Sequence, residues 1–391
     1  MQIPIFRGGG CVKKVKLGDL CEIQSGGTPS RSKPEFWVEG NIPWVKIKDI
    51  NSKFVDKVEE HITELGLQCS SAKLISRETI LYTIFATIGE VAILDIDAAT
   101  NQAIAGLYLK SEKVLKDYLY YFLLSIKNRV KNDSRGVAQN NINLTYLKNI
   151  EVPIVEIAHQ QEICDKLSTI NQIIAQRNKQ LIELSNLVKS RFNEMFGDPV
   201  LNEMGWEIET LNKIGTIGRG VSKHRPRNAS ELFGGIYPFI QTGDVANSGN
   251  YIVDYHSTYS EFGLKQSKLW DRGTLCITIA ANIAKTSILA FDSCFPDSIV
   301  GFIPGERTNN MFIHYWFSYF QKILESQAPE SAQKNINLKI LSELKVILPP
   351  LSLQNEFADF VAKIDKSQLA IQKSLEELET LKKSLMQEYF G

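Results

Sequence analysis

The chain repeats itself at a spacing of 194 to 195 residues, and this duplication constrains its fold more than any other feature. Residues 138–144 read Ala-Gln-Asn-Asn-Ile-Asn-Leu, and residues 332–338 read Ala-Gln-Lys-Asn-Ile-Asn-Leu. Further matches at these offsets are Phe196-Gly197 with Phe390-Gly391, and Pro43-Trp44 with Pro238-Phe239. The repeats of solenoid proteins run from about 20 to 50 residues. We therefore expect two whole related domains, which suit a target with two related halves.

The composition is that of an ordinary globular protein without a membrane segment. Of 391 residues, 43% are hydrophobic and 23% are charged, as in typical soluble domains. No run approaches the roughly 18 apolar residues of a membrane span, and the first residues lack the pattern of a signal peptide. The six cysteines are scattered without a CxxC pair. These features predict a cytoplasmic protein with reduced thiols and no metal site.

The net charge of zero limits the ways in which the chain could bind nucleic acid. Nonspecific coating of a phosphate backbone needs many clustered lysines and arginines. A balanced chain does not offer such a surface overall. Binding in a local basic cleft remains compatible with this composition.

Each copy ends in a long amphipathic segment that predicts a coiled-coil helix. Over about 158–196 and about 353–390, apolar side chains recur at alternating spacings of four and three, which is the heptad pattern. A helix with one apolar stripe must bury that stripe. We expect the two helices to pack on each other in antiparallel fashion; the alternative is packing of each on its own globular part. The expected seam, mainly an intramolecular contact, includes Ile163, Leu167, Leu184, Phe357, Val361 and Leu378.

The globular part of each copy mixes strands and helices, so the fold class is α+β. Residues 80–85 and 91–94 are expected to be strands, as are their counterparts 275–279 and 286–289. The aromatic segments 118–124 and 312–317 are expected to be core helices. Gly197-Asp198-Pro199 ends the first long helix, because glycine and proline commonly follow a helix end. The expected segments are 1–152, a first globular domain; 153–197, a central helix; 198–348, a second globular domain; and 349–391, a C-terminal helix.

The first copy carries an ordered series of motifs, namely Leu17-Gly-Asp-Leu20, Ser25-Gly-Gly-Thr-Pro-Ser30, Ile42-Pro-Trp-Val-Lys-Ile-Lys-Asp-Ile50, Ala86-Thr-Ile-Gly-Glu-Val-Ala92 and Asn101-Gln-Ala-Ile-Ala105. In this order, the motifs resemble the target-recognition domain of the specificity subunit of Type I restriction-modification enzymes. The second copy is similar in Tyr237-Pro-Phe-Ile-Gln-Thr-Gly-Asp-Val245 and Ala281-Asn-Ile-Ala-Lys-Thr-Ser287. It departs where Gly26-Gly27-Thr28-Pro29 is replaced by Gly220-Val221-Ser222-Lys223, so the two loops need not share a backbone path.

The resemblance implies a noncatalytic subunit that recognises a split sequence in double-stranded DNA. Each recognition domain would read one half of the site. The two helices would set the spacing of the halves in a pseudo-twofold molecule and bind two modification (methyltransferase) subunits. Those subunits would carry S-adenosylmethionine, while this chain would hold no cofactor. Restriction (motor-nuclease) subunits would join the complex for cleavage.

The residues that we expect to contact DNA lie in one loop of each copy and in segments near that loop. Arginine can read guanine, and glutamine can read adenine, through paired hydrogen bonds. The expected contacts of the first copy are Thr28, Ser30, Arg31 and Lys33 in the loop, and Lys46 and Lys48 on a strand near it. Those of the second copy are Arg219, Lys223, Arg225 and Arg227 in the loop, Gln241 and Thr242 on the matching strand, and Asn282 and Lys285 in a turn. For each, solvated surface is the alternative.

The repeated 138–144 and 332–338 segments are expected to cap the helices that follow them, since asparagine favours helix N-termini. Contact of these amides with DNA is the alternative. No phosphate loop, HExxH pair or nucleophile elbow is present. Pro296-Asp297 with Glu343-Leu-Lys345 resembles a nuclease motif, but only in one copy, so chance is the better explanation. The alternative functions are a nuclease with duplicated heads and a coiled-coil protein scaffold.

Overall fold

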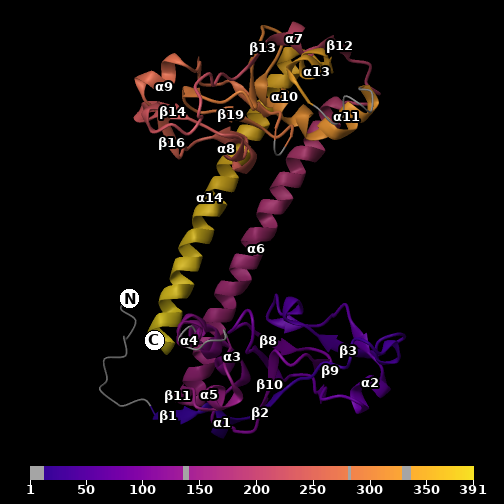
Figure 1. Cartoon of the computed structure of the whole chain (residues 1–391), viewed down its shortest axis with the longest axis vertical. Helices are drawn as coiled ribbons and strands as arrows, with labels where there is room; N and C mark the ends of the chain where they lie inside the picture. The colour runs from indigo at the N-terminus through magenta and orange to yellow at the C-terminus, as the bar shows by residue number, and fades with distance from the viewer. Residues whose placement is uncertain (1–12, 135–140, 281–282, 328–335) are drawn as a thin grey trace. The chain divides into compact units, whose positions relative to one another are not determined.

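The protein forms two compact units, described in a computed structural model for residues 13–134, 141–280, 283–327 and 336–391. Unit 1 comprises Met1–Arg177 and Ser374–Gly391, and unit 2 comprises Asn178–Lys373 (Figure 1). The long helices α6 (Ile157–Phe196) and α14 (Leu351–Phe390) therefore each give one half to either unit. This grouping differs from the four expected segments, whose division stays a prediction. We call residues 13–154 head 1 and residues 207–348 head 2.

Head 1 is built on a five-stranded sheet that is covered on both faces. In spatial order its strands are β2 (Cys21–Ser25), β10 (Ile104–Leu109), β7 (Ile80–Thr83), β8 (Val91–Leu94) and β4 (Phe54–Val55). Successive side chains of a strand point to opposite faces. Ile80 and Tyr82 accordingly join the core under helix α3 (Lys116–Ser125), while Leu81 joins a second core on the other face. The expected strands 80–85 and 91–94 thus lie at the centre of this sheet, the first ending at Thr83.

A second, four-stranded sheet of head 1 lies beside the loop that we expected to bind DNA. Its strands in order are β5 (His61–Ile62), β3 (Ile42–Val45), β9 (Ala98–Thr100) and β6 (Leu74–Ile75). Short helices flank it, namely η1 (Pro34–Phe36), η2 (Ile47–Asp49) and α2 (Glu64–Gln68). Away from this sheet, β1 (Lys13–Lys16) pairs with β11 (Glu151–Ile154), near α1 (Leu17–Leu20), α4 (Lys127–Ser134) and α5 (Leu144–Lys148).

Head 2 repeats both sheets in the same strand order, which confirms the duplication at the level of topology. Its five-stranded sheet is β13 (Gly215–Arg219), β21 (Ile299–Pro304), β18 (Leu275–Thr278), β19 (Thr286–Leu289) and β15 (Tyr251–Ile252). Its four-stranded sheet is β16 (Ser257–Tyr259), β14 (Phe233–Phe239), β20 (Ser293–Cys294) and β17 (Leu269–Trp270). The outer pair is β12 (Glu207–Thr210) with β22 (Lys345–Leu348).

The helices of head 2 follow the same plan. They are α7 (Leu211–Ile214), η3 (Ser230–Leu232), α8 (Thr242–Asn247), α9 (Glu261–Lys265), α10 (Asn310–Trp316), η4 (Phe317–Tyr319), α11 (Phe320–Gln327) and α13 (Leu338–Glu343). The expected aromatic helices are α3 and α10, and Phe312 and Trp316 are fully buried there. Aromatic burial of this kind dominates a core because each ring removes a large apolar area from water.

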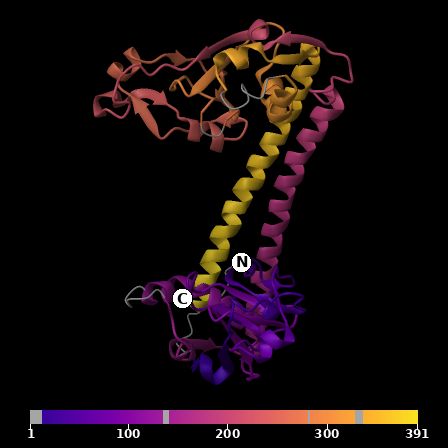
Figure 2. The ribbon, with the colours of Figure 1, turned by 45° about the vertical axis from the view of Figure 1, so that its right-hand side comes forward.

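In each unit the two long helices pack on each other and on the globular part together. In unit 2, Phe192 of α6 meets Phe357 of α14 edge to face at 5.4 Å and stacks on Phe312 of head 2 at 5.7 Å. In unit 1, Phe390 at the end of α14 packs on Tyr118 at 5.2 Å. The two helices lie side by side in both views (Figure 1, Figure 2). Helix–helix pairing and helix–head packing are therefore not alternatives, because both occur.

The seam residues divide according to how far they lie from a head. Ile163, Leu167, Phe357 and Val361 are buried in the cores of their units. Leu184 and Leu378 are only half-buried. The chain direction is antiparallel, since Arg191 pairs with Glu356 at 3.0 Å while Ser185 accepts a hydrogen bond from Gln368. The heptad pattern therefore predicted the right face of each helix, but Phe192, a buried ring that packs on the expected Phe357, lies outside the expected set.

Candidate nucleic-acid interface

The loop that follows β2 in head 1 begins with two glycines because the backbone runs too close to its neighbours for a side chain. The amide of Gly26 donates to the carbonyl of Ile104 at 3.0 Å, and that of Gly27 donates to Thr100 at 2.8 Å. A Cβ on Gly26 would collide with the backbone of Thr100. The loop beyond is thus held against β9, and its polar residues face outward from a fixed base.

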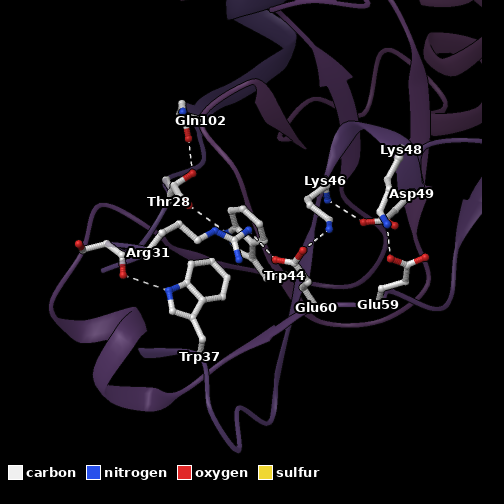
Figure 3. Close-up of polar contacts among 12 residues, drawn as sticks. Thr28, Arg31, Trp37, Trp44, Lys46, Lys48, Asp49, Glu59, Glu60 and Gln102 are labelled. Atoms are coloured by element: carbon white, nitrogen blue, oxygen red, sulfur yellow. Dashed lines mark hydrogen bonds and ion pairs between the residues drawn. The ribbon is translucent and has the colours of Figure 1, made fainter. Parts of the chain in front are cut away.

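Arg31 is the centre of a polar cluster that comes from four separate segments of head 1. Its guanidinium lies 3.7 Å from the ring centroid of Trp37 and 2.5 Å from a carboxylate oxygen of Glu60. Trp44 lies behind it, with 5.0 Å from the guanidinium carbon to the ring centroid. Figure 3 shows the Arg31 side chain running between the two indoles toward Glu60. The arginine is therefore positioned by a cation–π contact and an ion pair together.

The two tryptophans of this cluster also fix the loop through their indole nitrogens. The indole of Trp44 donates to the carbonyl of Gly27, and that of Trp37 donates to the carbonyl of Ser30, each at 3.1 Å. Their rings meet edge to face with centroids 5.0 Å apart. Because both rings are anchored, the loop carrying Thr28 to Lys33 has a defined conformation over the described residues.

Lys46 and Lys48 do not lie on a strand, which corrects the expectation for these positions. Strand β3 ends at Val45, and Lys46 precedes the single 3₁₀ turn η2. The carboxylate of Asp49 accepts from the backbone amide of Lys46 at 2.8 Å and so stabilises the turn in place of a strand bond. The lysines reach outward from this turn, where Lys46 pairs with Glu60 and Lys48 pairs with Glu59.

Arg31, Lys46 and Lys48 of head 1 thus each pair with a carboxylate, although the side chains of Arg31 and Lys48 are 53% and 52% exposed. Hydrogen bonding from Lys46 holds the pKa of Glu60 below its ordinary value, and Lys48 does the same for Glu59. The bond to Glu59 in turn raises the pKa of Lys48. Glu59 and Glu60 therefore stay negatively charged at neutral pH, and any phosphate that approaches must compete with the two glutamates.

The remaining expected residues of the head 1 loop flank this cluster. The hydroxyl of Thr28 bonds the side-chain oxygen of Gln102, which lies just beyond β9. Ser30 is within 2.9 Å of Ser32, hydroxyl to hydroxyl. The ammonium of Lys33 lies 5.0 Å from the ring centroid of Phe36. Of these three residues, Ser30 also touches the Arg31 cluster, because its carbonyl accepts from the indole of Trp37. Contact of these residues with DNA stays a prediction.

In head 2, two arginines of the basic loop contact the same residue, Asp297. The guanidinium of Arg227 lies 2.7 Å from Asp297, and Arg219 donates to the carbonyl of the same residue. Arg225 folds back on its own loop and donates to the carbonyls of Ser222 at 2.8 Å and His224 at 2.7 Å. The side chain of Lys223 is exposed. Three of the four expected cations therefore shape the loop as well as giving it positive charge.

The two loops start alike and then diverge, as the sequence difference suggested. Gly220 donates to Ile299 at 2.8 Å, which matches the bond from Gly26 to Ile104 in head 1. Beyond that point the partners change. Ser267 donates to the carbonyl of Val221 at 2.8 Å, where head 1 uses the indole of Trp44 on Gly27.

Gln241 and Thr242 also lie off the expected strand and border a pocket with Arg227. Strand β14 ends at Phe239, Gln241 precedes helix α8, and Thr242 is the first residue of that helix. The carboxylate of Asp244 accepts from the amide of Gln241 at 2.7 Å, as Asp49 does for Lys46. The pocket has a volume of about 340 Å³ and is lined by all three expected residues. Arg227 lies 14 positions before Gln241 in the sequence, and the fold places it on the same pocket as Gln241 and Thr242.

The turn between β18 and β19 does not join this group. Lys285 is exposed and borders a different pocket of about 400 Å³, beside His314. The expected contact Asn282 lies outside the described residues. In head 1 the position matching Lys285 is Glu90, which pairs with Lys127 at 2.6 Å.

The repeated asparagines cap helices, which confirms the structural interpretation of that motif. The side chain of Asn143 accepts from the amide of Tyr146 at 2.7 Å, at the start of α5. Asn337 accepts from the amide of Ile340 at 3.1 Å, at the start of α13. Residues 138–140 and 332–335 of the motif lie outside the described residues.

Several residues that build the two sites were not expected from the sequence. They are Trp37, Trp44, Glu60 and Gln102 in head 1, and Phe233, Phe239, Tyr259 and Asp297 in head 2. The offset of the repeat carried a signal for four of them, the aromatic residues Trp37, Trp44, Phe233 and Phe239. Trp37 and Phe233 differ by 196 positions, while Trp44 and Phe239 differ by 195. Both copies have an aromatic residue at these matching positions beside a polar loop, and this pattern could have indicated the site.

Two further properties concern the described part of the chain as a whole. Within the ranges that the structure describes, no three or more His, Cys, Asp or Glu side chains gather in a way that could hold a metal ion. Among the helices described, none combines the length and apolar character that a membrane crossing requires. Five cysteines in these ranges, Cys21, Cys69, Cys164, Cys276 and Cys294, are free thiols.

Comparison with a known family covers both heads. Residues 11–185 and 203–381 each match the family model described as the Type I restriction modification DNA specificity domain. The two matches together span most of the chain and repeat once, in agreement with the duplicated topology. Each match takes in a head together with about half or more of the long helix that follows it.

Curated relatives and solved structures agree with that match over nearly the full length. The MjaIX specificity subunit of Methanocaldococcus jannaschii is 24% identical over 96% of this chain and 91% of its own. The EcoprrI specificity subunit of Escherichia coli is 24% identical, covering 90% and 88%. The crystal structure of a Type I S subunit from M. genitalium has a TM-score of 0.59 at 17% identity, covering 99% and 98%. A chain from a structural study of type I R-M complex assembly has a TM-score of 0.63 at 17% identity, covering 97% of each.

Proposed function

The chain belongs to the Type I restriction modification DNA specificity domain family, and from that premise we propose that it recognises a bipartite DNA sequence, one half with each head. Its two heads are recognition domains of a specificity subunit. DNA specificity requires contacts to base edges, whereas phosphate contacts supply position and affinity. The two candidate sites are therefore the places where the two halves of a target would be distinguished.

One observation carries this proposal, namely that matching positions of the two heads hold different chemistry on the same scaffold. Lys46 and Gln241 both precede a helical turn that an aspartate stabilises from three residues ahead. One can offer a cation and the other an amide. Arg31 is paired with Glu60, whereas its counterpart Arg227 is paired with Asp297. Two heads of one fold with unlike side chains would read two unlike half-sites.

The experiment that tests the proposal is selection of bound sequences from random duplex DNA by the chain in complex with its modification subunits. We expect two short motifs separated by an unread gap of constant length. Changing Gln241 to alanine should relax the second motif alone, and changing Lys46 to alanine should affect the first alone. A single continuous motif, or loss of both motifs in either variant, would contradict the assignment of one head to each half-site.

The chain acts in this proposal without performing chemistry itself. The modification subunits would carry S-adenosylmethionine and methylate adenine, and restriction subunits would cleave, within the cytoplasm. Asp297, the acidic residue of the nuclease-like motif, is engaged by Arg227 instead of facing a metal cluster. Purified chain incubated with Mg²⁺ and target DNA should neither nick nor cleave it. Neither the nuclease nor the scaffold alternative is favoured by an observation in the described residues.

The long helices would set the spacing of the half-sites and bind the partner subunits. Each is a continuous helix of 40 residues, or about 60 Å at 1.5 Å per residue. In unit 2, Leu369 of α14 and Val253 of head 2 are 72% and 76% exposed and border a groove of about 580 Å³. Exposed apolar groups that cluster at a groove are typical of protein interfaces. A modification subunit should therefore co-purify with the wild type and be lost from a Leu369→Glu, Val253→Glu variant that still folds.

A further inference from the structure

Head 2 contains an aromatic pocket whose match in head 1 is filled by an arginine. The pocket, of about 340 Å³, is bordered by Phe233, Phe239 and Tyr259 together with Ser222, Gln241 and Arg227. Its volume is at the lower end of the range for small-ligand sites, about 300–1,000 Å³.

The aromatic wall of the pocket is rigid. The rings of Phe239 and Tyr259 are stacked with centroids 4.1 Å apart, and both side chains are buried. Phe233 is tilted against Tyr259 at 5.3 Å and is only half-buried. Because the rings are packed and Phe233 remains partly exposed, the wall offers an apolar face to a planar group without any rearrangement.

The remaining border of the pocket is polar and includes both hydrogen-bond donors and hydrogen-bond acceptors. The amide of Gln241 has both donor and acceptor groups, and Ser222 has a hydroxyl. The guanidinium of Arg227 lies at the rim, held 2.7 Å from Asp297. A ligand in this pocket would therefore meet aromatic carbon on one side, hydrogen-bonding groups at its edge and positive charge at the entrance.

Head 1 shows what kind of group this arrangement accepts. Trp37 and Trp44 occupy the positions that match Phe233 and Phe239, and Arg31 matches Arg227 at an offset of 196 residues. In head 1 the planar guanidinium of Arg31 lies 3.7 Å from the centroid of Trp37. In head 2 the corresponding arginine is drawn to Asp297, so that the rings border open space. The same site thus holds a planar, hydrogen-bonding group in one head and is available for one in the other.

We propose that the pocket of head 2 receives one unstacked base of the DNA half-site that this head reads. The inference rests on the proposed function, because it assumes that head 2 contacts DNA. A nucleobase has the required form, with an aromatic face for Phe233 and a hydrogen-bonding edge for Gln241. Stacking of a base on an aromatic side chain is worth about 1–3 kcal/mol. Arg227 at the entrance would pair with the phosphate of the same nucleotide.

The proposal is tested by placing 2-aminopurine at each position of the second half-site in turn. We use the full complex with its modification subunits, and in parallel the chain alone. At one position the fluorescence should rise severalfold on binding, because 2-aminopurine is quenched while it is stacked. A mismatch at that position should tighten binding by roughly tenfold, because a base whose pair is already broken costs less to unpair.

Pocket variants separate this signal from any base that the methyltransferase subunits unstack for themselves. Phe233→Ala and Gln241→Ala should abolish the fluorescence rise at the assigned position. Tyr255→Ala, which removes an exposed aromatic ring of head 2 outside the pocket, should leave it unchanged. A signal that persists in both pocket variants belongs to the partner subunits and overturns the proposal.

Two other outcomes are decisive and distinct. If the complex selects a bipartite sequence but no second-half position responds, the base stays stacked and the pocket proposal is wrong while the proposed function stands. The same holds if replacing thymine by uracil weakens binding without any change in fluorescence, because the pocket then contacts a methyl group of an intact duplex. If no bipartite sequence is selected, the proposed function itself fails.

Discussion

Gln160 and Gln354 make the same set of hydrogen bonds in the two units, at positions 194 residues apart. The side-chain oxygen of Gln160 accepts from the amide of Leu115 at 2.8 Å, and its nitrogen donates to Lys113 and Val155 at 2.8 Å each. Gln354 does the same with Asn309, Arg307 and Pro349, at 2.9, 3.1 and 2.8 Å. Both side chains are fully buried. Each glutamine joins the start of a long helix to the segment before the aromatic helix of its head.

Replacing Gln160 by alanine should destabilise unit 1 by about 2–4 kcal/mol, because a buried backbone group that loses its partner costs about 1–3 kcal/mol. The measurement is the thermal unfolding transition of the full chain. Gln161→Ala is the matched control, since Gln161 is exposed and bonds only to Asp165 one turn along the helix. Equal transitions for the two variants would show that the buried network contributes nothing to stability.

Asp365→Asn should stabilise unit 2 at neutral pH. Burial raises the pKa of Asp365, which also accepts from Asn250 at 2.8 Å, and the matching residue of the first copy is Asn171. When the pKa of a carboxyl is higher in the folded than in the unfolded state, the protein loses folding stability as pH rises from the unfolded pKa to the folded pKa. The gain from Asp365→Asn should therefore appear above that window and vanish at more acidic pH. Exposed Asp359→Asn serves as control; a gain that is independent of pH would contradict this account.

Acid should destabilise head 2 through His314. Burial lowers the pKa of this imidazole from 6.5 to about 4, and its Nδ1 lies 2.9 Å from the hydroxyl of Thr286. In the unfolded chain, His314 binds a proton below pH 6.5, whereas in the folded chain it does so only near pH 4. The folding stability is therefore fully present above pH 6.5 and falls as the pH drops from 6.5 toward 4. The loss is at most about 3 kcal/mol, at about 1.4 kcal/mol per pKa unit.

The test for His314 compares melting temperatures between pH 7 and pH 4 in the wild type and in His314→Gln. The variant should lack most of the fall that the wild type shows. His61→Gln, which changes an exposed histidine of head 1, should behave like the wild type. Parallel pH profiles for wild type and His314→Gln would assign the acid sensitivity to other groups.

Glu60→Gln should strengthen DNA binding by head 1 severalfold at all sequences. Arg31 and Lys46 both pair with this carboxylate, and exposed ion pairs stabilise a fold by only about 0–1 kcal/mol. Removing the glutamate charge leaves both cations available to phosphate. The measurement is affinity as a function of salt concentration on cognate and unrelated duplexes, with exposed Glu64→Gln as control. Weaker binding of every sequence would mean that Glu60 positions the cations for DNA and does not compete with it.

Inserting four residues after Ile174 should lengthen the gap between the two selected motifs by one or two base pairs. Four residues extend α6 by about 6 Å and keep the apolar stripe roughly in phase, and successive base pairs are about 3.4 Å apart. Both half-motifs should stay the same. Four residues inserted after Gly205, in the turn before β12, should leave the gap unchanged. A constant gap in the helix variant would remove the helices from the recognition of spacing.

Features that depend on local periodicity could be predicted from the sequence. The long helices follow from apolar spacings of four and three, and the caps at Asn143 and Asn337 from the residue type and the segments that follow. The offset between copies predicted two like domains, which the identical strand orders of the two heads confirm. For the helices and the caps, the interacting groups lie close together in the sequence. For the duplicated domains, the signal is the similarity of the two copies themselves.

Features that depend on the partner of a side chain were decided only by the tertiary structure. Arg31 meets Glu60 across 29 positions and Arg227 meets Asp297 across 70, and no local pattern specifies such pairs. Lys46 was expected on a strand, but its amide donates to the carboxylate of Asp49 and the chain turns there. The sequence alone determined which segments form helices, strands and repeats, since backbone structure responds to nearby residues. Only the packed fold decided which cations are paired and where a pocket stays open, since those outcomes depend on residues that meet in space.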